Sequence, residues 1–334
     1  MLGSFVSALI RCQDYFAIVF AAAWAAVNYH NVIASSYHLA GRWLNFVLPA
    51  DSGEKSLWRK LFDRNPLFTV ACDKLAARDF ALTAVPQLQV APLRWSGTDL
   101  ELAPAEVLTG DVVFKPNNGS GMVVLVRNGK PSQTELAAIG RRWLAKPYGQ
   151  EMGLWGYVNA RACLLVEEML MREGRPIDHQ YSFHVAGGIT AYVRVKLGTP
   201  DETSFLILDR DGSSRPVSSQ GEGQRLTFVP PLSFASMRAI AERLGAHFDF
   251  VRVDLYDLEG SIIFGELTVY PGSSGGAGGH TDLVRLHNEM WDLRRSCFLT
   301  TPQRGWRALY AAALRRHLNR IQPHAHSGRN SRET

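Results

Sequence analysis

The sequence predicts an α+β fold, and three observations support this fold class. Apolar stretches typical of helices lie near both ends of the chain, at residues 15–27 and 306–321. Residues 111–126 and 249–269 between them have the alternation and the turn residues of β-hairpins. A chain of 334 residues, 46% of them hydrophobic, can bury a sizeable core. We therefore expect helical ends around a centre that is built mainly of antiparallel strands.

The first element is the apolar run from Tyr15 to Val27. A run of thirteen residues is too short for a bilayer core of about 30 Å, and the polar stretch 28–31 interrupts it. A signal peptide normally has a basic leader, whereas only Arg11 precedes this run. We expect a packed or interfacial helix, and a signal sequence or membrane anchor is the alternative.

The first hairpin has the features of an anion-binding loop. Val112–Lys115 predicts a strand, and Met122–Val126 predicts its antiparallel return. Gly119 and Gly121 in the loop allow unusual dihedral angles, so that amide N–H groups can converge on an anion. The last residue of the first strand, Lys115, adds a positive charge beside them. The combination suits a triphosphate, and a plain turn is the alternative because the spacing is not that of a P-loop.

The second hairpin brings charged residues together. Side chains alternate along strands, so Arg252 and Asp254 share one face, and Glu266 and Thr268 share a face of the partner strand. A three-residue turn at 258–260 would place Arg252 opposite Glu266, with Asp254 diagonal to it. Two converging carboxylates repel each other unless a cation lies between them, and Mg²⁺ favours this donor set. A solvent-facing sheet with ordinary charges is the alternative.

The segment between the hairpins predicts a buried strand and a third hairpin. The strand lies in Cys163–Leu170, where Glu167 is either a strand-end charge or a contact to a nucleotide base. Asp178 follows, and then Tyr181–Val185 and Thr190–Lys196 form a hairpin around two glycines.

The C-terminal residues 301–334 hold seven Arg and one acid, a net charge of +6. Their apolar residues recur at helical spacing, which predicts an amphipathic helix with the stripe Trp306, Leu309, Tyr310, Ala313, Leu314, His317, Leu318 and Ile321. This helix either docks on its own protein or lies on an anionic membrane. The polar tail after Pro323 is predicted to be disordered.

The remaining 300 residues carry a net charge of −1, which argues against an extended nucleic-acid surface. The four cysteines are scattered, without the spacing of a zinc site, and we expect them to be reduced. Reduced cysteines favour a cytoplasmic location.

In this order, the motifs resemble those of ATP-grasp enzymes, and most closely those of the TupA-like ATP-grasp family, which is linked to teichuronopeptide and capsule-type polysaccharide synthesis. The resemblance covers about 60% of the chain. It rests on five stretches, DKLAARDF (73–80), FKPNNGSG (114–121), LVEEML (165–170), IDHQYSFHVAGG (177–188) and VRVDLYDLEGSIIFGELTVYPGSSGG (251–276).

The resemblance implies an ATP-grasp fold that holds ATP between a lid lobe and a C-terminal lobe with a mostly antiparallel sheet. It implies five parts: an N-terminal helical segment (1–50), an N-terminal α/β lobe (51–110), the lid lobe (111–166), the C-terminal lobe with a metal site (167–300), and the basic amphipathic helix with its disordered tail (301–334).

The resemblance also implies which residues bind the nucleotide. Lys115 and Arg78 would contact phosphates, a loop would fold over the triphosphate, a hinge would lie against adenine, and Asp178 would hold the ribose. The loop residues are Asn118, Gly119, Ser120 and Gly121, and the hinge residues are Glu167, Glu168, Met169 and Leu170.

Asp254, Glu266 and Thr268 would ligate Mg²⁺ by the same resemblance. Arg252 and Lys115 would be catalytic, and the glycines of 272–279 would lie near an acyl phosphate. Thr268 stands where the wider superfamily has Asn, and Gln180 stands where the family pattern has Lys. Either Arg194 or Lys196 would supply a further basic contact.

The resemblance implies an ATP- and Mg²⁺-dependent ligase that activates a small-molecule or glycan carboxylate as an acyl phosphate and joins it to an amine. A phosphotransferase acting on a sugar hydroxyl and a non-catalytic scaffold for glycan assembly are the alternatives. We expect no nucleic-acid partner. We expect a cytoplasmic protein that contacts the inner face of the membrane through its C-terminal basic helix.

Overall fold

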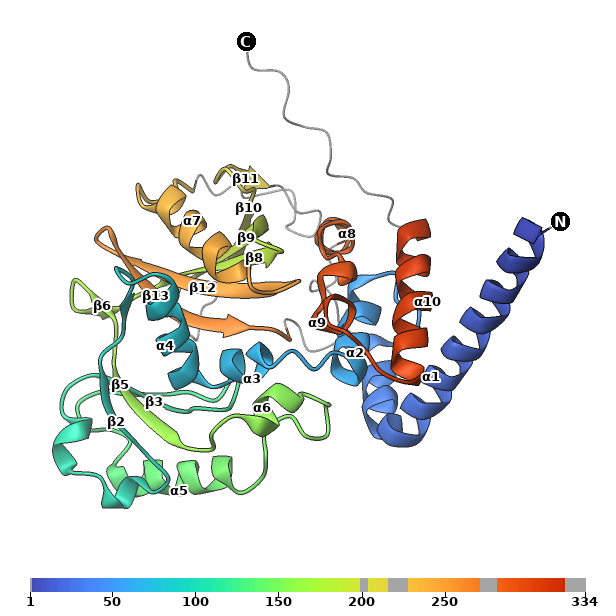
Figure 1. The fold of residues 1–334 in the computed structure, drawn as a ribbon. Helices are drawn as coiled ribbons and strands as arrows, with labels where there is room; N and C mark the ends of the chain where they lie inside the picture. Colours follow the sequence, from blue (N-terminus) through green and yellow to red (C-terminus); the bar gives the residue numbers. More distant parts are fainter. Residues whose placement is uncertain (1, 199–203, 216–227, 271–280, 322–334) are drawn as a thin grey trace, which may run out of the picture. The chain divides into compact units, whose positions relative to one another are not determined.

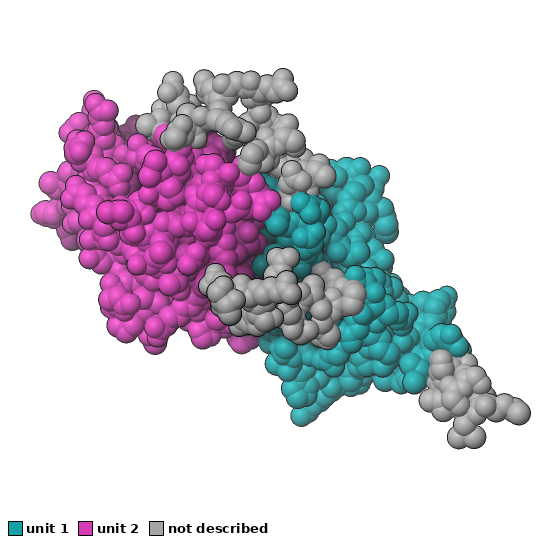
Figure 2. Space-filling model, turned by 90° about the horizontal axis from the view of Figure 1, so that it is seen from above, with its two compact units in different colours: residues 1–65, 272–334 teal, residues 66–271 magenta. Residues whose placement is uncertain are grey.

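The computed structural model describes residues 2–198, 204–215, 228–270 and 281–321 (Figure 1). The glycine-rich segment 272–279 and the tail after Pro323 lie outside the described residues. The chain divides into two compact units: unit 1 contains residues 1–65 and 272–334, and unit 2 contains residues 66–271 (Figure 2). The two ends of the chain therefore belong to one unit, whereas the five-part division expected from the motifs stays a prediction.

Unit 1 is helical in its described residues. Its helices are α1 (Leu2–Ala40), α2 (Ser52–Phe62), α8 (Thr281–Met290), η4 (Leu293–Arg295), α9 (Cys297–Thr300) and α10 (Trp306–Ile321). Helix α10 packs along α1, where Ala17, Ala21 and Ala25 are buried and allow close approach. The middle of the predicted apolar stripe of α10, including Leu314, is buried as well. The C-terminal helix is thus docked within its own unit.

Helix α1 is longer than the thirteen-residue apolar run. It continues through the polar stretch 28–31 with a single break in helical geometry at Tyr29 (φ −136°, ψ 26°). The helical stretch of residues 10–40 is long and apolar enough to cross a membrane by length and composition, and its most apolar 18-residue window has a mean hydropathy of 1.4. Core helices of soluble proteins and signal sequences pass the same test. The length of the run therefore does not exclude a span.

Unit 2 contains two main sheets. The larger sheet has the order β1-β13-β12-β8-β9-β10-β11, and its neighbours are antiparallel except for the parallel pair β1–β13. Its strands are β1 (Gln89–Val90), β8 (His179–Ala186), β9 (Ile189–Leu197), β10 (Ser204–Leu208), β11 (Ser214–Arg215), β12 (Val251–Leu258) and β13 (Ser261–Thr268). The smaller, antiparallel sheet has the order β2-β5-β3-β4, with β2 (Leu93–Gly97), β3 (Val112–Pro116), β4 (Val124–Val126) and β5 (Leu164–Glu168). The short pair β6 (Met171–Arg172) and β7 (Arg175–Pro176) stands apart.

Helices cover one face of each main sheet. The helices of unit 2 are α3 (Leu67–Cys72), α4 (Lys74–Ala84), η1 (Leu100–Leu102), η2 (Ala105–Leu108), α5 (Gln133–Leu144), α6 (Trp155–Asn159) and α7 (Phe234–Gly245). On the larger sheet, Phe183 and Val253 are buried in a core shared with Met237 of α7. On the smaller sheet, Phe114 packs with Leu136 of α5 in a second core. The expected α+β fold is confirmed.

Two of the three predicted hairpins have the expected pairing. Strand β3 pairs antiparallel with β4, with Val112 opposite Val126. Strands β8 and β9 pair around Gly187 and Gly188, whose φ angles of 54° and 85° only glycine adopts without strain.

The register predicted for β12 and β13 is wrong by one to two residues. The turn has only two residues, Glu259 and Gly260, with φ angles of 54° and 86°. Gly265 is then an extra residue, a β-bulge, so that Asp254 lies directly opposite Glu266. A Cβ atom at Gly265 would lie 2.9 Å from the ring of Tyr256 and 3.0 Å from the carbonyl oxygen of Asp254. The bulge thus needs glycine.

Candidate functional site

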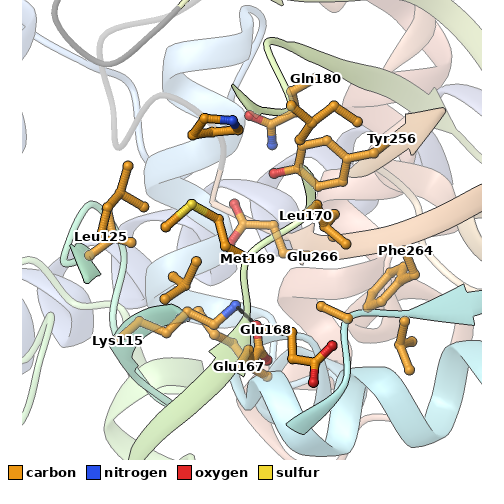
Figure 3. Close-up of a pocket in the computed structure, with 18 of the residues that line it drawn as sticks. Lys115, Leu125, Glu167, Glu168, Met169, Leu170, Gln180, Tyr256, Phe264 and Glu266 are labelled. Atoms are coloured by element: carbon orange, nitrogen blue, oxygen red, sulfur yellow. Dashed lines mark ion pairs between the residues drawn. The ribbon is translucent and has the colours of Figure 1, made fainter. Parts of the chain in front are cut away.

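A cavity of about 440 Å³ lies in unit 2, lined by residues of both main sheets (Figure 3). Part of its wall is apolar, with Val90, Val113, Leu125, Met169, Leu170, Tyr256 and Phe264. Charged residues line the rest, with the cations Lys74, Arg78, Lys115 and Lys196 and the anions Glu167, Glu168, Asp178 and Glu266. An apolar wall beside clustered cations fits a ligand that has a flat ring and an anionic chain.

One carboxylate holds two of the cations in place. The carboxylate of Glu167 at the end of β5 lies 3.0 Å from Arg78 Nη1 and 2.5 Å from Lys115 Nζ, and only 7% of its side chain is exposed. The buried ion pairs fix both cations at the cavity wall, where a phosphate can replace part of their hydration. The carboxylate of Glu167 thus contacts cations, whereas the sequence suggested a base contact or a strand-end charge.

Lys74, at the first turn of α4, holds the glycine-containing loop after β3. Its ammonium donates hydrogen bonds to the carbonyl oxygens of Asn117, at 3.3 Å, and of Gly119. Asn117 also accepts from the backbone N–H of Leu75 at 3.0 Å. Lys74 belongs to the motif DKLAARDF (73–80), but the motif predicted a role only for Arg78. Its part in the site depends on the close approach of this loop to α4.

The hinge after β5 contributes two apolar side chains to the cavity. Met169 and Leu170 point into it, and the backbone is fixed by hydrogen bonds from Met169 N to Asp111 O (3.2 Å) and from Ile177 N to Leu170 O (2.9 Å) (Figure 3). Asp178 follows at the cavity wall, with its Oδ1 2.5 Å from His179 Nδ1. Burial acts to raise the pKa of Asp178, and the hydrogen bond with His179 outweighs it, so this pKa is lowered.

The carboxylates of Asp254 and Glu266 meet at one guanidinium. Arg252 Nη2 lies 2.7 Å from Asp254 Oδ2 and 2.7 Å from Glu266 Oε1, and Arg252 Nε lies 2.8 Å from Asp254 Oδ1. Gln180 Nε2 donates to Asp254 at 2.9 Å, and Thr268 Oγ1 donates to Glu266 at 3.2 Å. The side chain of Asp254 is fully buried, whereas that of Glu266 is 30% exposed and lines the cavity.

The pKa values of the two carboxyl groups move in opposite directions. Burial raises the pKa of Asp254 in spite of the neighbouring Arg252. Burial also acts to raise the pKa of Glu266, but Arg252, Lys74 and Lys115 outweigh it and lower this pKa. Glu266 therefore remains ionised over the physiological range and available as a ligand.

The donor set around these carboxylates fits Mg²⁺. Asp254, Glu266 and the hydroxyl of Thr268 offer only oxygen atoms, and Mg²⁺ prefers one or two carboxylates together with phosphate oxygens and water. Among the described residues, no group of three or more His, Cys, Asp or Glu forms a denser metal site. A cation held by the pair would lie beside the anionic end of a ligand in the cavity.

A family model described as TupA-like ATPgrasp matches residues 54–283, which include the whole site. The chain belongs to this family. The fold of the TupA-like protein is thus an ATP-grasp fold, as the motifs predicted. None of the curated proteins compared with the chain matches it.

Solved structures also resemble the TupA-like protein. A D-alanine–D-alanine ligase from Bacillus anthracis complexed with ATP is 12% identical, with a TM-score of 0.44 over 80% of this chain and 72% of that chain. An L-amino acid ligase from Bacillus licheniformis is 14% identical, with a TM-score of 0.42 over 73% and 55% of the two chains. The ATP-grasp ligase PsnB, complexed with a minimal precursor, Mg and ADP, is 11% identical, with a TM-score of 0.38 over 76% and 60%.

Most predicted site residues of the TupA-like protein meet at the cavity. Its wall includes Arg78, Lys115, Gly119, Ser120, Gly121, Glu167, Glu168, Met169, Leu170, Asp178 and Glu266. Arg252, Asp254 and Thr268 do not line it and lie next to Glu266 on the same sheet. Asn118 is buried outside the cavity, where its amide donates to the carbonyl oxygen of Tyr157 at 3.5 Å.

Arg194 and Lys196 occupy different positions. Lys196 lines the cavity, and Arg194 does not. In the sheet register, Arg194 stands in one row with Ser182, Asp254 and Glu266. Its guanidinium lies over the ring of Phe205 at 4.8 Å, and its buried Nε has no hydrogen-bond partner in the part of the chain that the structure describes. Burial and the nearby Arg252 lower the pKa of Arg194. Arg194 thus lies near another cation, Arg252, and has no ion pair among the described residues. Such a position is suited to binding an anionic ligand.

Lys74 makes the site sensitive to pH. Burial lowers the pKa of this lysine to about 8, the charge of Lys115 adds to the effect, and Glu266 opposes it. Lys74 is cationic below this pKa and neutral above it, so the affinity for an anion falls as pH rises through it. We expect the affinity for Mg·ATP to fall by up to about tenfold per pH unit between about pH 8 and 9. Calorimetry on Lys74→Arg, which stays charged, should show a flat profile; an unchanged slope in this variant would refute the assignment.

Proposed function

We propose that this protein is an ATP- and Mg²⁺-dependent ligase that activates a carboxylate as an acyl phosphate and joins it to an amine. The observation that carries the proposal is the placement of Asp254 and Glu266 directly opposite each other, with Glu266 at the wall of a cavity that Lys74, Arg78 and Lys115 also line. Membership of the TupA-like ATP-grasp family supports the same activity class.

The proposed nucleotide site has two parts, one for the adenosine and one for the triphosphate. The adenine ring would lie against Met169, Leu170 and other apolar residues of the wall, with the ribose hydroxyls near Asp178. The triphosphate would extend toward Lys115 and Arg78, which Glu167 holds in place. Asp254 and Glu266, with Thr268 beside them, would hold Mg²⁺, which supplies charge neutralisation for the β- and γ-phosphates when bound.

The proposed reaction has two steps. A carboxylate oxygen of the substrate attacks the γ-phosphorus of ATP, an O–P bond forms, and the bond to the β–γ bridging oxygen breaks to release ADP. The amine then attacks the acyl carbon, phosphate leaves, and the amine gives up a proton. Charge spreads over the oxygens of the transferring group, so Arg252 and Lys115 act by position and electrostatics.

An acyl phosphate hydrolyses in water, so the site has to exclude solvent during the reaction. The loop from Asn117 to Gly121 is suited to this task because two of its carbonyl oxygens are tied to Lys74. A Cβ atom at Gly119 would lie 2.2 Å from Met122 and 2.8 Å from Pro116, so the loop closes tightly only with glycine here.

The proposed biological role is amide formation on a cell-surface polysaccharide or a teichuronopeptide-type polymer, with a uronic acid or an amino acid as the carboxylate. This role rests on the resemblance to the TupA-like family. Because the reaction consumes ATP, we place the protein in the cytoplasm.

Calorimetry of ATP binding with and without Mg²⁺ tests the nucleotide site first. Release of ADP and inorganic phosphate is then measured with a panel of uronates and amino acids, each with and without amines. ADP and phosphate that appear only when both substrates are present support the ligase. ADP with a stable phosphoester would indicate a phosphotransferase. If the folded protein does not bind Mg·ATP, the non-catalytic scaffold for glycan assembly is the remaining alternative.

Arg194 provides a test of the carboxylate substrate. We expect Arg194→Gln to raise the KM for the activated carboxylate about 10- to 100-fold, because a charge-assisted hydrogen bond is worth about 1.5–3 kcal/mol. The affinity for Mg·ATP should stay within about twofold. Lys196→Gln is the matched variant, and it should weaken Mg·ATP instead, since Lys196 lines the cavity. Equal effects of both variants on the affinity for Mg·ATP would refute the assignment of Arg194 to the carboxylate substrate and of Lys196 to the nucleotide.

A further inference from the structure

Charge is divided unequally between the two units. Unit 1 contains 16 Lys and Arg and 8 Asp and Glu, a net charge of +8. The other 20 Lys and Arg and 23 Asp and Glu lie in unit 2, whose net charge is −3. The site of the proposed reaction lies in the acidic unit, so its phosphate ligands do not account for the basic charge of unit 1. This charge favours an anionic partner of unit 1 itself.

Helix α1 presents an exposed apolar face on this basic unit, with no partner among the described residues. Tyr15, Phe16, Val19 and Val27 are between 46% and 77% exposed. Their spacing along the sequence places them on one side of the helix. We call this set the outer face of α1. Only 22% of the most apolar part of the helix is buried. Aromatic and aliphatic side chains at such exposure are typical of a surface that inserts into another phase.

The opposite side of α1 packs against α10 over the same length. Trp306 contacts Phe20 and Trp24, with ring centroids 5.4 and 5.1 Å apart. At the other end of α10, Arg316 Nε lies 2.9 Å from Asp14 Oδ2. The two helices are therefore antiparallel. One side of α1 is covered by α10, and the outer face is the side that remains.

This pairing decides between a helix that spans a membrane and a helix that lies on one. A span of residues 10–27 would carry α10 into the hydrocarbon with its guanidinium groups, among them Arg307, Arg315 and Arg316. The free-energy cost of placing this many arginines in the hydrocarbon core of a bilayer is very high. A helix that lies in the interface buries only its apolar face and leaves the charges of its partner in water or among headgroups.

We propose that the outer face of α1 docks unit 1 on an anionic lipid surface, with the helix lying in the plane of the interface. The aromatic residues enter the headgroup boundary, and basic residues near the ends of the α1–α10 pair contact anionic headgroups. Arg11, Arg304 and Arg320 are exposed, and none has an ion pair among the described residues. The apolar stripe of α10 is packed, so we assign the lipid contact to α1 rather than to the C-terminal helix.

Sedimentation of the full-length protein with vesicles tests this inference. We expect binding to phosphatidylcholine vesicles that contain phosphatidylglycerol and much weaker binding to phosphatidylcholine alone. Phe16→Glu and Val27→Glu should each lower the partition coefficient about tenfold or more, because each replaces an inserted apolar group by a charge. Leu102→Glu is the matched control, since Leu102 is 85% exposed on unit 2.

A second pair of variants tests the charges. Arg304→Gln combined with Arg320→Gln should weaken binding to anionic vesicles about fivefold per arginine. Arg142→Gln combined with Lys146→Gln on unit 2 should have no effect. Circular dichroism and Mg·ATP binding of each variant show that it is folded.

Two outcomes overturn the inference. Failure of the wild-type protein to sediment with anionic vesicles would refute binding to an anionic lipid surface. Retention on vesicles in about 1 M NaCl, where the Debye length is only about 3 Å, together with resistance to alkaline extraction, would indicate a spanning helix instead. Neither result affects the proposed ligase, whose test uses Mg·ATP and ADP release without lipid.

Discussion

Replacement of Arg252 by Met should make the stability of this protein depend on Mg²⁺. The guanidinium is the cation that separates the buried Asp254 from Glu266, at 2.7 Å from each. Removal of one partner from a buried ion pair costs about 3–5 kcal/mol, because the remaining charges are left uncompensated. For a unit of this size, we expect the Tm to fall by roughly 6–20 °C in the absence of divalent ions.

Addition of Mg²⁺ should restore much of this loss, because the two carboxylates then have another cation to bind. Differential scanning calorimetry with and without Mg²⁺ measures both effects. Arg210→Met is the control: Arg210 forms a surface pair with Glu242 in which the arginine is 53% exposed, and its loss should cost less than about 1 kcal/mol. A Tm of Arg252→Met that does not respond to Mg²⁺ would contradict the assigned metal site.

Replacement of Glu266 by Gln should abolish the Mg²⁺ dependence of ATP binding. The amide keeps the shape of the side chain and an oxygen that can accept from Thr268, but it loses the negative charge that attracts the cation. We expect turnover to fall by about 10²-fold or more, the size of effect seen when a preorganised electrostatic contact is lost. Calorimetry and ADP release measure the two effects separately.

Glu168→Gln is the matched control for this prediction. Glu168 also lines the cavity, but its carboxylate is 45% exposed and pairs with Arg94 at 3.3 Å. It should retain Mg²⁺-dependent binding. Equal losses in the two variants would mean that general negative potential in the cavity, and not ligation by Glu266, holds the metal.

Local patterns in the sequence predicted the strand pairs that carry the site. The hairpins at 112–126 and 181–196 form as expected because their turns contain glycines at the required positions. The alternation in β12 also placed Arg252 and Asp254 on one face correctly. These features depend only on neighbours in the chain, which a single sequence displays.

The features that were missed depend on an irregularity in strand pairing or on contacts between distant segments. The register of β12 and β13 differs because the turn is shorter than expected and Gly265 is an extra residue that pattern counting does not detect. Lys74 joins the site because α4 approaches the loop after β3. The length of α1 was underestimated because its polar stretch is held by a distant segment: the hydroxyl of Tyr29 accepts a hydrogen bond from Arg64, just after α2.

The bulge at Gly265 determines which side of the sheet Glu266 faces. Before the bulge, Phe264 pairs with Leu255 on the core side of the sheet, and after it Glu266 pairs with Asp254 on the ligand side. If Gly265 instead paired with Asp254 as an ordinary strand residue, Glu266 would lie opposite Val253, in the hydrophobic core, although every charged residue of the site would still be present in the sequence. One unpaired residue thus keeps Phe264 on the core side and turns Glu266, which follows it in the strand, to the ligand side.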